Sequence, residues 1–501
     1  MKKFLLILLC MAFLTSLSFA QGETVMDYWY PRSMGSASLT EYEDGSLGIQ
    51  GRTMDWNSPG HDFDLIAGNQ YSFKVEVFQD EQTEAQMILS VAHTKDGTES
   101  YENLAFAKAK KGEWTTLEAG YVAGDFDRFV IYIETLGAPT LAYQFRNFTF
   151  TGVEAVFGSA ETGSETTEVP SLKEKFQDYF AFGTAVTQNE AYNRQRMDFY
   201  ASQFNIMTPG NELKPDYVLD VSASAKLAAE DECQAAVHFD RVKPLLTYAW
   251  EHGIKIHGHV LVWHQQTPEA FFHEGYNISK PLVTREVLLG RLSSYTEKIM
   301  EYLEENYPGM VVSWDVLNEA IDDQTGQLRD SKWLSIVGED YPERAYEIAR
   351  KYAPEGVQLY YNDYNTAYEP KQTGIVHLLE RLLADGTVDG YGFQMHHDLS
   401  QPSVDQIRKS LERIAALPLK LRVSELDLTI PDNQEATLEK QAAKYKAIFE
   451  LLLPYRDRLE AVQVWGVTDD LSWRAWGYPL LFDHNAQPKP AFYAILETLP
   501  E

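Results

Sequence analysis

The fold is constrained most by the part of the chain beyond Ser171, where short apolar runs alternate with longer segments of helical periodicity. Residues 341–352, for example, carry apolar side chains at spacings of three and four, as an amphipathic helix does. Eight apolar runs are predicted strands: 180–186, 205–209, 255–263, 311–317, 357–361, 390–395, 419–424 and 461–467. Eight strand and helix units over this length are typical of the α/β fold called the (β/α)8 TIM barrel, which we predict for residues 171–501.

The preceding part of the chain has a different pattern. Residues 21–155 contain short runs of alternating apolar and polar side chains, such as 71–78, 129–133 and 143–150, separated by Gly and Asp turns. This alternation predicts an all-β sandwich module of antiparallel strands. Residues 156–170 are small, polar and acidic without an apolar period, and we predict an acidic linker there.

The first twenty residues predict a signal peptide. Lys2 and Lys3 precede an apolar run at 4–14 and a small-residue exit that ends at Ala20, where we expect cleavage. The run is too short to span a membrane. Lipid attachment at Cys10 is an alternative, although the bulky Leu9 before it disfavours that interpretation. We therefore expect an exported protein, secreted or periplasmic, without membrane insertion.

Charge and cysteine content exclude other classes of protein. The net charge is −31 with 43 Lys and Arg residues in no evident cluster, which argues against nucleic acid and anionic membranes as partners. A neutral polymer is an acceptable substrate. After removal of the signal peptide Cys233 is the one remaining cysteine, so the folded protein has no internal disulfide.

Two strand ends place carboxyl groups where a barrel carries its chemistry. The predicted strand 311–317 is followed by Asn318 and Glu319, and the strand 419–424 is followed by Glu425 and, two residues on, Asp427. Three units separate the two Glu residues, so they belong to strands four and seven. A lone Glu at a strand end can simply cap the next helix, but two facing carboxylates are what glycoside hydrolysis needs.

Other polar side chains share faces with this pair. Residues two apart on a strand point the same way, so His257, His259 and Trp263 lie on one side of their strand. Gln394 and His396 do the same on strand six. These side chains should therefore gather at the carboxyl ends of the strands, around one cleft.

Six motifs in sequence order carry a resemblance that covers the barrel. They are TPGNELK (208–214), GHVLVWH (258–264), WDVLNE (314–319), GYGFQMH (390–396), SELD (424–427) and WGVTDDLSW (465–473). On these motifs the chain from about 171 to 500 resembles glycoside hydrolase family 10, the retaining endo-β-1,4-xylanases. The resemblance implies hydrolysis of xylan and xylo-oligosaccharides without a cofactor.

The resemblance also implies roles for individual residues. Glu319 would be the general acid/base and Glu425 the nucleophile, with His396 bonded to Glu425 and oriented by Asp427. Asn318 would bind the 2-hydroxyl of the sugar being cleaved. The remaining substrate-binding residues that it implies are Asn211, Lys214, His259, Trp263, Gln394, Trp465, Trp473 and Tyr364.

The N-terminal module resembles carbohydrate-binding module family 22. The motifs are GRTMDW (51–56), GEW (112–114) and IYIET (131–135). By resemblance, the candidate glycan contacts are Trp56, Tyr101, Tyr132 and Glu134. Each of these aromatics has a core position as an equal alternative. We assign Trp114 to the core of the module.

Several residues have structural interpretations that compete with a functional one. We expect His257 to be a hydrogen-bonded core histidine, Trp314 to serve in packing, and Asn362 and Asp363 to anchor the loop after strand five. The chain has Gly210 where the family usually has Glu, so one contact to the second glycone sugar is expected to be missing. A competing explanation is structural: the backbone after Pro209 has a positive φ that requires glycine.

Two other functions compete with hydrolysis of xylan. One is a related retaining barrel hydrolase that cuts β-1,4- or mixed-linkage glucan, and the other is a non-catalytic glycan-capture protein. A catalytic metal is disfavoured because the sequence shows no His and Cys spacing suited to zinc. We expect no metal or other cofactor, and a monomer.

Overall fold

The computed structural model describes residues 29–33, 37–42, 44–63, 65, 69–95, 98–124, 126–151, 159–162 and 165–500. The chain divides into two compact units, residues 1–156 and 157–501. The predicted signal peptide lies outside the described residues. Among the helices that are described, none is both long and apolar enough to cross a membrane.

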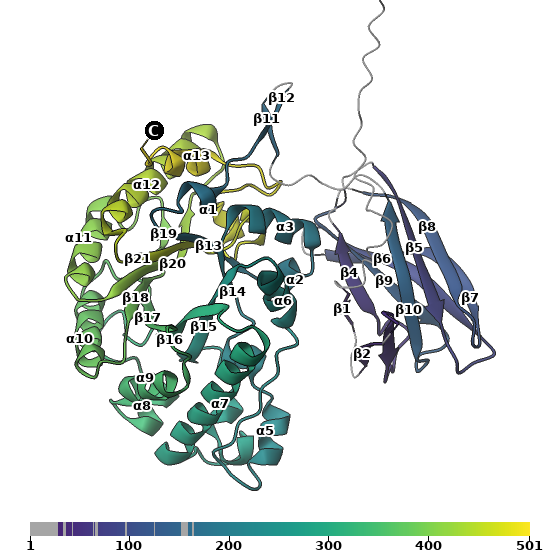
Figure 1. Ribbon diagram of the computed structural model, residues 1–501, viewed down its shortest axis with the longest axis horizontal. Helices are drawn as coiled ribbons and strands as arrows, with labels where there is room; N and C mark the ends of the chain where they lie inside the picture. Colours follow the sequence, from purple (N-terminus) through teal and green to yellow (C-terminus); the bar gives the residue numbers. More distant parts are fainter. Residues whose placement is uncertain are drawn as a thin grey trace, which may run out of the picture. The chain divides into compact units, whose positions relative to one another are not determined.

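The N-terminal unit is the predicted all-β module (Figure 1). One antiparallel sheet has the order β1-β4-β9-β6-β7 and the other β2-β3-β10-β5-β8. The strands are β1 (Tyr30–Pro31), β2 (Ser38–Glu41), β3 (Leu47–Gln50), β4 (Pro59–Phe63), β5 (Gln70–Phe78), β6 (Glu84–Lys95), β7 (Thr98–Lys110), β8 (Thr115–Val122), β9 (Arg128–Leu136) and β10 (Tyr143–Thr151).

Alternation along the strands builds the core of this unit. On β5 the side chains of Phe73, Val75 and Val77 are fully buried, whereas the residues between them are polar. Trp114, which we expected in this core, is half-buried instead. Its ring packs 5.3 Å from that of Phe78 and lies 3.9 Å beneath the Arg146 guanidinium. It precedes β8 at the edge of its sheet, where a cation rather than the facing sheet covers it.

The predicted linker contains a small element that composition did not indicate. Strands β11 (Ser159–Thr162) and β12 (Glu165–Glu168) pair antiparallel, with Ser159 opposite Glu168. Threonine favours extended backbone, which is compatible with such a hairpin even without an apolar face.

The C-terminal unit is the predicted closed parallel barrel, and all eight predicted strands are confirmed (Figure 1). Neighbouring strands pair in parallel in sequence order, and β18 closes the barrel by pairing with β20. The strands are β13 (Ala181–Val186), β14 (Ile206–Pro209), β15 (Lys255–Trp263), β16 (Val311–Asn318), β17 (Gln358–Asp363), β18 (Gly390–Phe393), β20 (Lys420–Thr429) and β21 (Leu459–Val464).

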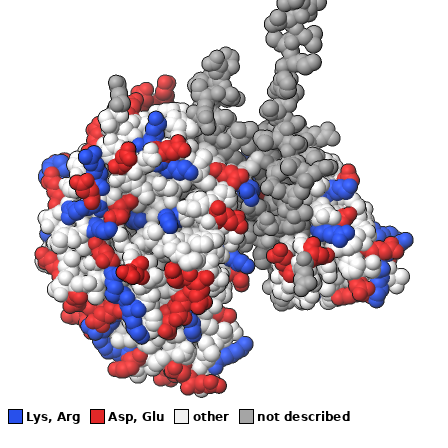
Figure 2. Space-filling model, in the orientation of Figure 1, with Lys and Arg blue, Asp and Glu red and all other residues white. Residues whose placement is uncertain are grey.

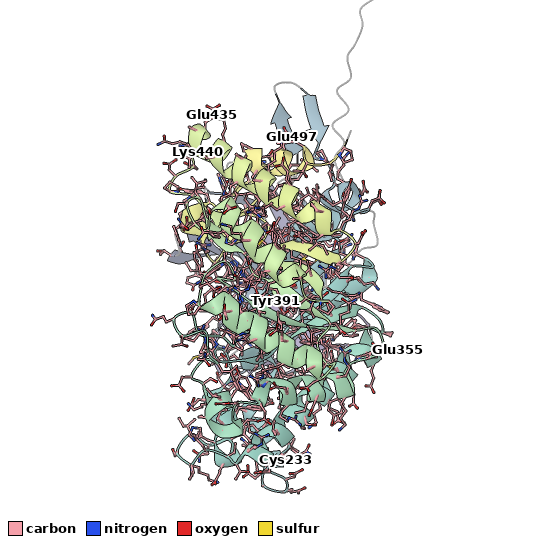
Figure 3. The ribbon with its side chains drawn as sticks, turned by 90° about the vertical axis from the view of Figure 1, so that its left-hand side faces the viewer. Cys233, Glu355, Tyr391, Glu435, Lys440 and Glu497 are labelled. Atoms are coloured by element: carbon pink, nitrogen blue, oxygen red, sulfur yellow. The ribbon has the colours of Figure 1, made fainter. Side chains whose placement is uncertain are left out.

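Helices surround the barrel on the outside. In Figure 3, which looks onto the side formed by α10, α11 and α12, Glu435 and Lys440 of α12 are exposed whereas Tyr391 of β18 is fully buried. The α-helices are α1 (Leu172–Lys175), α2 (Gln188–Ala191), α3 (Arg194–Gln203), α4 (Pro215–Val218), α5 (Val221–Leu227), α6 (Lys243–Glu251), α7 (Arg285–Asn306), α8 (Lys332–Val337), α9 (Tyr341–Tyr352), α10 (Lys371–Ala384), α11 (Val404–Ala415), α12 (Glu435–Leu452) and α13 (Pro490–Leu496). The 3-10 turns are η1 (Glu269–Phe272), η2 (Glu274–Tyr276), η3 (Leu453–Tyr455), η4 (Asp469–Leu471) and η5 (Ala475–Gly477).

Helix α11 turns an apolar face to the inside of the unit. On α11, Ile407, Leu411 and Ile414 are buried at spacings of four and three, and Ser403 caps the N-terminus through a capping box. On the face of the barrel seen in Figure 2, acidic and basic side chains are interspersed. That face therefore offers no basic stripe for a polyanion.

The barrel departs from the predicted strands at the two places where the site forms. Strand β20 continues past 424 to Thr429, and it pairs there with a short additional strand, β19 (His396–Asp398). His396 stands opposite Asp427 in this pairing. A search for apolar runs does not find these two strand segments because they carry polar side chains. They are nevertheless strands, because each pairs with the other.

Candidate active site

Glu319 follows the last residue of β16 in an unusual backbone conformation. Its φ is +53°, in the left-handed region that residues other than glycine rarely adopt. Its backbone N–H donates to Asn362 O at 2.9 Å. The half-buried carboxylate accepts from Trp263 Nε1 at 3.0 Å and from Gln394 Nε2 at 3.1 Å. Backbone strain of this kind gathers at functional sites, where the surroundings must hold it in place.

Glu425 lies on β20 and is 5% exposed. Asn362 Nδ2 donates to its Oε1 at 2.7 Å and His396 Nε2 to its Oε2 at 3.1 Å. Burial alone would raise the pKa of Glu425, but the hydrogen bond from His396 and the charges of the nearby His259 and His396 lower it below its usual value. Glu425 is therefore a buried carboxylate that remains charged.

His396 is held in a charged form by two carboxylates. Its Nδ1 donates to Asp427 Oδ2 at 2.7 Å, while Nε2 reaches Glu425. Burial would lower the pKa of His396, but Asp427 and Glu425 raise it to about 10. Asp427 also accepts from Trp473 Nε1 at 2.9 Å and from Arg474 Nη1 at 2.6 Å. These donors keep the pKa of Asp427 low despite the burial that opposes them.

A chain of carboxamides joins the two carboxylates. Gln394 Nε2, which donates to Glu319, also donates to Asn318 Oδ1 at 3.2 Å. Asn362 Nδ2 donates to the same Asn318 oxygen at 2.9 Å and to Glu425 Oε1 at 2.7 Å. Because Asn318 Oδ1 accepts both bonds, its NH2 group is the part left to donate to a ligand. The chain thus fixes the orientation of the Asn318 amide.

Asn362 is a site residue that sequence analysis treated as a loop anchor. Its Oδ1 accepts from Ser424 Oγ at 2.6 Å, which orients the amide toward Glu425. A Cβ on Gly392 would lie 2.5 Å from Asn362 Oδ1, so glycine there makes room for the side chain. The signal that could have revealed Asn362 is its register, because it stands opposite Asn318 on the neighbouring strand.

Asp363 remains an anchor beside the site. It is fully buried and lies 2.8 Å from Lys371 Nζ, and Tyr361 donates to it. Burial raises the pKa of Asp363 to about 6 against the opposing effect of Lys371.

Two histidines of β15 share one carboxylate. His257 Nε2 and His259 Nδ1 each lie 2.9 Å from Asp315 Oδ2. His257 is 1% exposed, its Nδ1 is 2.8 Å from Ser313 Oγ, and burial lowers its pKa to about 4. It is the core histidine that we expected. The ring of His259 lies beside that of Trp465, with 5.6 Å between their centres.

Lys214 and Asn211 lie beside the carboxylates. Lys214 Nζ donates to Asn211 Oδ1 at 2.9 Å and stands 5.1 Å from the centre of the Trp263 ring. Burial lowers the pKa of Lys214, and the charges of Glu425 and Glu319 act in the opposite direction. The lysine therefore contributes a positive charge within the electrostatic reach of both carboxylates.

The aromatic residues line the site at different depths. Trp465 and Trp473 lie 6.3 and 5.0 Å from the ring of His396, and Trp473 is 64% exposed. Tyr364 is not in this cluster. Its hydroxyl group contacts Asp323 and accepts from Arg329 Nη2 at 3.2 Å, and Arg329 Nε in turn donates to the backbone oxygen of Glu319.

Gly210 does not have the positive φ that would require glycine. A Cβ there would contact Thr187 Cγ2 at 3.4 Å, which is an ordinary van der Waals distance. The backbone explanation for this glycine is therefore wrong, and the position has room for the beginning of a side chain.

The N-terminal unit brings only some of its candidate residues to the surface. Trp56 and Tyr101 are 55% and 60% exposed. Glu134 is half-buried and accepts from Ser90 Oγ at 2.7 Å. Tyr132 is 3% exposed because the Arg32 guanidinium lies 4.3 Å from its ring centre, so it does not offer the open ring face that we expected. The Arg32 guanidinium also lies 5.6 Å from the centre of the Tyr101 ring. Arg32 belongs to none of the motifs in the sequence, so the sequence did not indicate that it would contact these rings.

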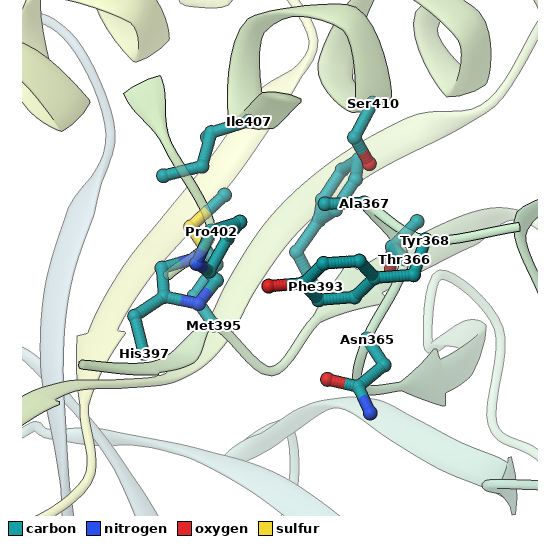
Figure 4. Close-up of a pocket in the computed structure, with 10 residues that line it drawn as sticks. All are labelled: Asn365, Thr366, Ala367, Tyr368, Phe393, Met395, His397, Pro402, Ile407 and Ser410. Atoms are coloured by element: carbon teal, nitrogen blue, oxygen red, sulfur yellow. The ribbon is translucent and has the colours of Figure 1, made fainter. Parts of the chain in front are cut away.

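The described residues include no group of three or more His, Cys, Asp or Glu side chains arranged to hold a metal ion. A separate small pocket, shown in Figure 4, lies between the chain around β18 and helix α11. Met395 and His397 line it, whereas His396 between them reaches Glu425. Alternation along the chain thus separates this pocket from the site.

A parallel barrel with two hydrogen-bonded carboxylates on strands four and seven, bordered by tryptophans, has the architecture of the glycoside hydrolases. Residues 171–498 match the family model described as Glycosyl hydrolase family 10. The chain belongs to this family. Residues 16–140 match a model described as Carbohydrate binding domain.

Similar proteins span both units. Endo-1,4-beta-xylanase A of Thermoanaerobacterium saccharolyticum is 33% identical over 469 residues, which are 91% of this chain and 38% of that protein. Exoglucanase XynX of Acetivibrio thermocellus is 30% identical over 482 residues, 92% of this chain and 43% of that protein. The chain thus spans less than half the length of these two relatives.

Among solved structures, the CBM22-1 and GH10 modules of an endo-1,4-beta-D-xylanase from Clostridium thermocellum, complexed with xylohexaose, align with a TM-score of 0.70 at 27% identity. The alignment covers 96% of each chain.

Proposed function

We propose that this protein is a retaining endo-β-1,4-xylanase that hydrolyses xylan and xylo-oligosaccharides. The observation that carries the proposal is the pair Glu319 and Glu425, joined by one chain of amide hydrogen bonds within a family 10 barrel. Xylanases among the similar proteins, one of them solved with xylohexaose, support the choice of substrate.

The two carboxylates have different surroundings, which suit different roles. Glu425 is buried, charged and hydrogen-bonded on both oxygens, as a nucleophile must be. It would form a bond to the anomeric carbon while Glu319 gives its proton to the departing glycosidic oxygen. Glu319 would then remove a proton from water, whose oxygen displaces Glu425 and restores the enzyme.

Neighbouring groups would bind the sugar during these steps. The free NH2 group of Asn318 is oriented to donate to the 2-hydroxyl, a contact that strengthens in the transition state. Lys214 and Asn211 supply a positive charge and an amide on the glycone side. Trp465 and Trp473 present ring faces that can stack on sugar rings, and Trp473 can close over a xylose because this sugar has no hydroxymethyl group.

A glucan hydrolase is the second candidate, because one relative that matches 92% of the chain is described as an exoglucanase. The test is to measure release of reducing sugar from xylan, cellulose and mixed-linkage glucan under the same conditions. We expect turnover on xylan with a rapid fall in viscosity. Faster hydrolysis of either glucan would favour the second candidate, and no turnover on any polymer would favour a capture protein.

Stereochemistry tests the mechanism separately. NMR of early products from an aryl β-xylobioside should show the β-anomer first, because two displacements restore the starting configuration. First appearance of the α-anomer would contradict the assignment of Glu425 as a nucleophile.

The proposal extends to the rest of the chain. The N-terminal unit would be a family 22 module that binds xylan through Trp56, Tyr101 and Glu134. The signal peptide predicted at 1–20 would direct export, to the periplasm or the medium. Because one chain supplies every residue of the barrel site described above, a monomer suffices for activity.

A further inference from the structure

The peptide groups that follow β16 are hydrogen-bonded one after another. Glu319 O accepts from Arg329 Nε at 3.1 Å, and Ala320 O accepts from Arg329 N at 2.7 Å. Ile321 O accepts from Arg329 Nη2 at 3.2 Å. Three successive carbonyl groups, beginning with that of the strained residue, are thus bonded to a single arginine.

The loop between these residues brings Arg329 back to the strand end. Ile321 and Leu328 form an isolated antiparallel bridge, and the turn between them is closed by Gly326 N donating to Asp322 O at 3.0 Å. Ala320 N donates to Tyr361 Oη at 3.1 Å, which secures the same segment from β17. The side chain of Arg329 is 19% exposed, so most of it is enclosed by the groups that it contacts.

We infer that Arg329 is a positioning residue for Glu319, and this inference rests on the function proposed above. A left-handed conformation at a residue other than glycine costs free energy and persists only where contacts impose it. The Arg329 guanidinium imposes it by holding the carbonyl of Glu319 and that of Ile321 together. Glu319 is itself the residue with the positive φ, so its backbone conformation sets the direction of its Cα–Cβ bond and thereby of its carboxyl group.

Arginine is suited to this task in a way that lysine is not. Its planar guanidinium has several N–H groups in fixed directions, so one side chain bonds Glu319 O, Ile321 O and the Tyr364 hydroxyl group at once. An ammonium group has no such planar geometry. Arg329 also links Glu319 to Tyr364, one of the substrate-binding residues that the family resemblance implies.

The role predicts a dependence on the leaving group. A xylo-oligosaccharide departs as an alcohol and needs the proton that Glu319 supplies, whereas 2,4-dinitrophenolate departs without one. Misplacing Glu319 should therefore slow the first substrate and spare formation of the covalent intermediate from the second. Damage to the whole barrel would slow both substrates to a similar extent.

The test compares Arg329→Met, Arg329→Lys and a matched control, Arg350→Met. Arg350 likewise bonds backbone oxygens, those of Val357 and Thr387, but these precede β17 and β18 at the opposite end of the barrel. The substrates are xylohexaose and 2,4-dinitrophenyl β-xylobioside, with kcat/KM for both and Tm for every variant.

For Arg329→Met we expect kcat/KM on xylohexaose to fall by about 10- to 100-fold and that on the dinitrophenyl substrate by less than about 3-fold. Arg329→Lys should lie between wild type and Met, and Arg350→Met should leave the ratio of the two rates unchanged. If Arg329→Met does not fold, the ratio in Arg329→Lys decides.

Two results would overturn the inference. An equal loss on both substrates, or no loss on xylohexaose in a folded Arg329→Met enzyme, would show that Arg329 does not position the acid. These results are distinguishable from failure of the proposed function, because that failure would appear as wild-type protein inactive on xylohexaose.

Discussion

Replacing Asn362 by Ala tests whether the amide chain supports the nucleophile. The change removes the hydrogen bond to Glu425 Oε1 at 2.7 Å and the one to Asn318 Oδ1 at 2.9 Å, and it leaves Ser424 without its acceptor. A hydrogen bond to a charged group contributes about 1.5–3 kcal/mol. Since about 1.4 kcal/mol corresponds to a factor of ten, kcat/KM should fall by roughly 10- to 150-fold.

The pH dependence gives the sign of the effect. Glu425 must be ionised to act, and its surroundings lower its pKa in the folded enzyme below the usual value of a glutamate. A hydrogen bond to the carboxylate stabilises the charged form, so its loss raises this pKa. The acid limb of the kcat/KM profile should therefore lie at higher pH in Asn362→Ala than in the wild type.

The assay is kcat/KM across pH on xylohexaose and on 2,4-dinitrophenyl β-xylobioside. Both substrates need the nucleophile, so both should lose activity, in contrast to the selective loss expected at Arg329. Ser424→Ala removes only the bond to Asn362 Oδ1 and should show a smaller shift in the same direction. An unchanged acid limb with unchanged kcat/KM would refute the argument that Asn362 stabilises the charge of Glu425.

Three further experiments test separate parts of the proposal. Glu319→Ala should still form the covalent intermediate from the dinitrophenyl substrate and gain rate with azide, releasing the β-glycosyl azide. Glu425→Ala should lose turnover of both substrates, and any product that it forms with azide should be the α-glycosyl azide. Identical losses on every substrate, with no azide rescue in either variant, would contradict our assignment. Gly210→Glu should raise kcat/KM on short unsubstituted xylo-oligosaccharides because a charged hydrogen bond contributes about 1.5–3 kcal/mol, and Gly210→Ala should fold normally, as a melting curve would show. Trp56→Ala should reduce retention on insoluble xylan several-fold, measured by pull-down, because it removes an exposed ring face in the turn between β3 and β4. Val122→Ala, at the exposed end of the edge strand β8, should not.

The sequence predicts the barrel well because its strands are buried on both sides. Each strand then reads as a continuous apolar run between amphipathic helices, and pairing with neighbours confirms the order. The prediction is weaker where strands become polar. The extension of β20 to Thr429 and the short β19 carry Glu425, Asp427 and His396, which no apolar period marks.

Residue types show that a site exists, but contacts decide which residues complete it. From the sequence alone Asn362 is predicted to anchor a loop. Its pairing opposite Asn318 on the neighbouring strand places it within hydrogen-bonding distance of Glu425. Tyr132 looks like a sugar platform until Arg32 is seen over its ring. Trp114 looks like core because it is large, yet its place before an edge strand leaves it half-buried. Distances between chain segments far apart in sequence determine all three outcomes.

The amide chain between Glu319 and Glu425 also acts as an insulator. In this chain Gln394 and Asn362 donate hydrogen bonds and Asn318 accepts them, but a carboxamide neither gains nor releases a proton in the range where carboxyl groups titrate. A proton therefore cannot pass along the chain from one carboxyl group to the other. It leaves Glu319 toward the sugar oxygen and returns to Glu319 from water, so the side chains that fix the geometry of the pair also keep its two protonation states apart.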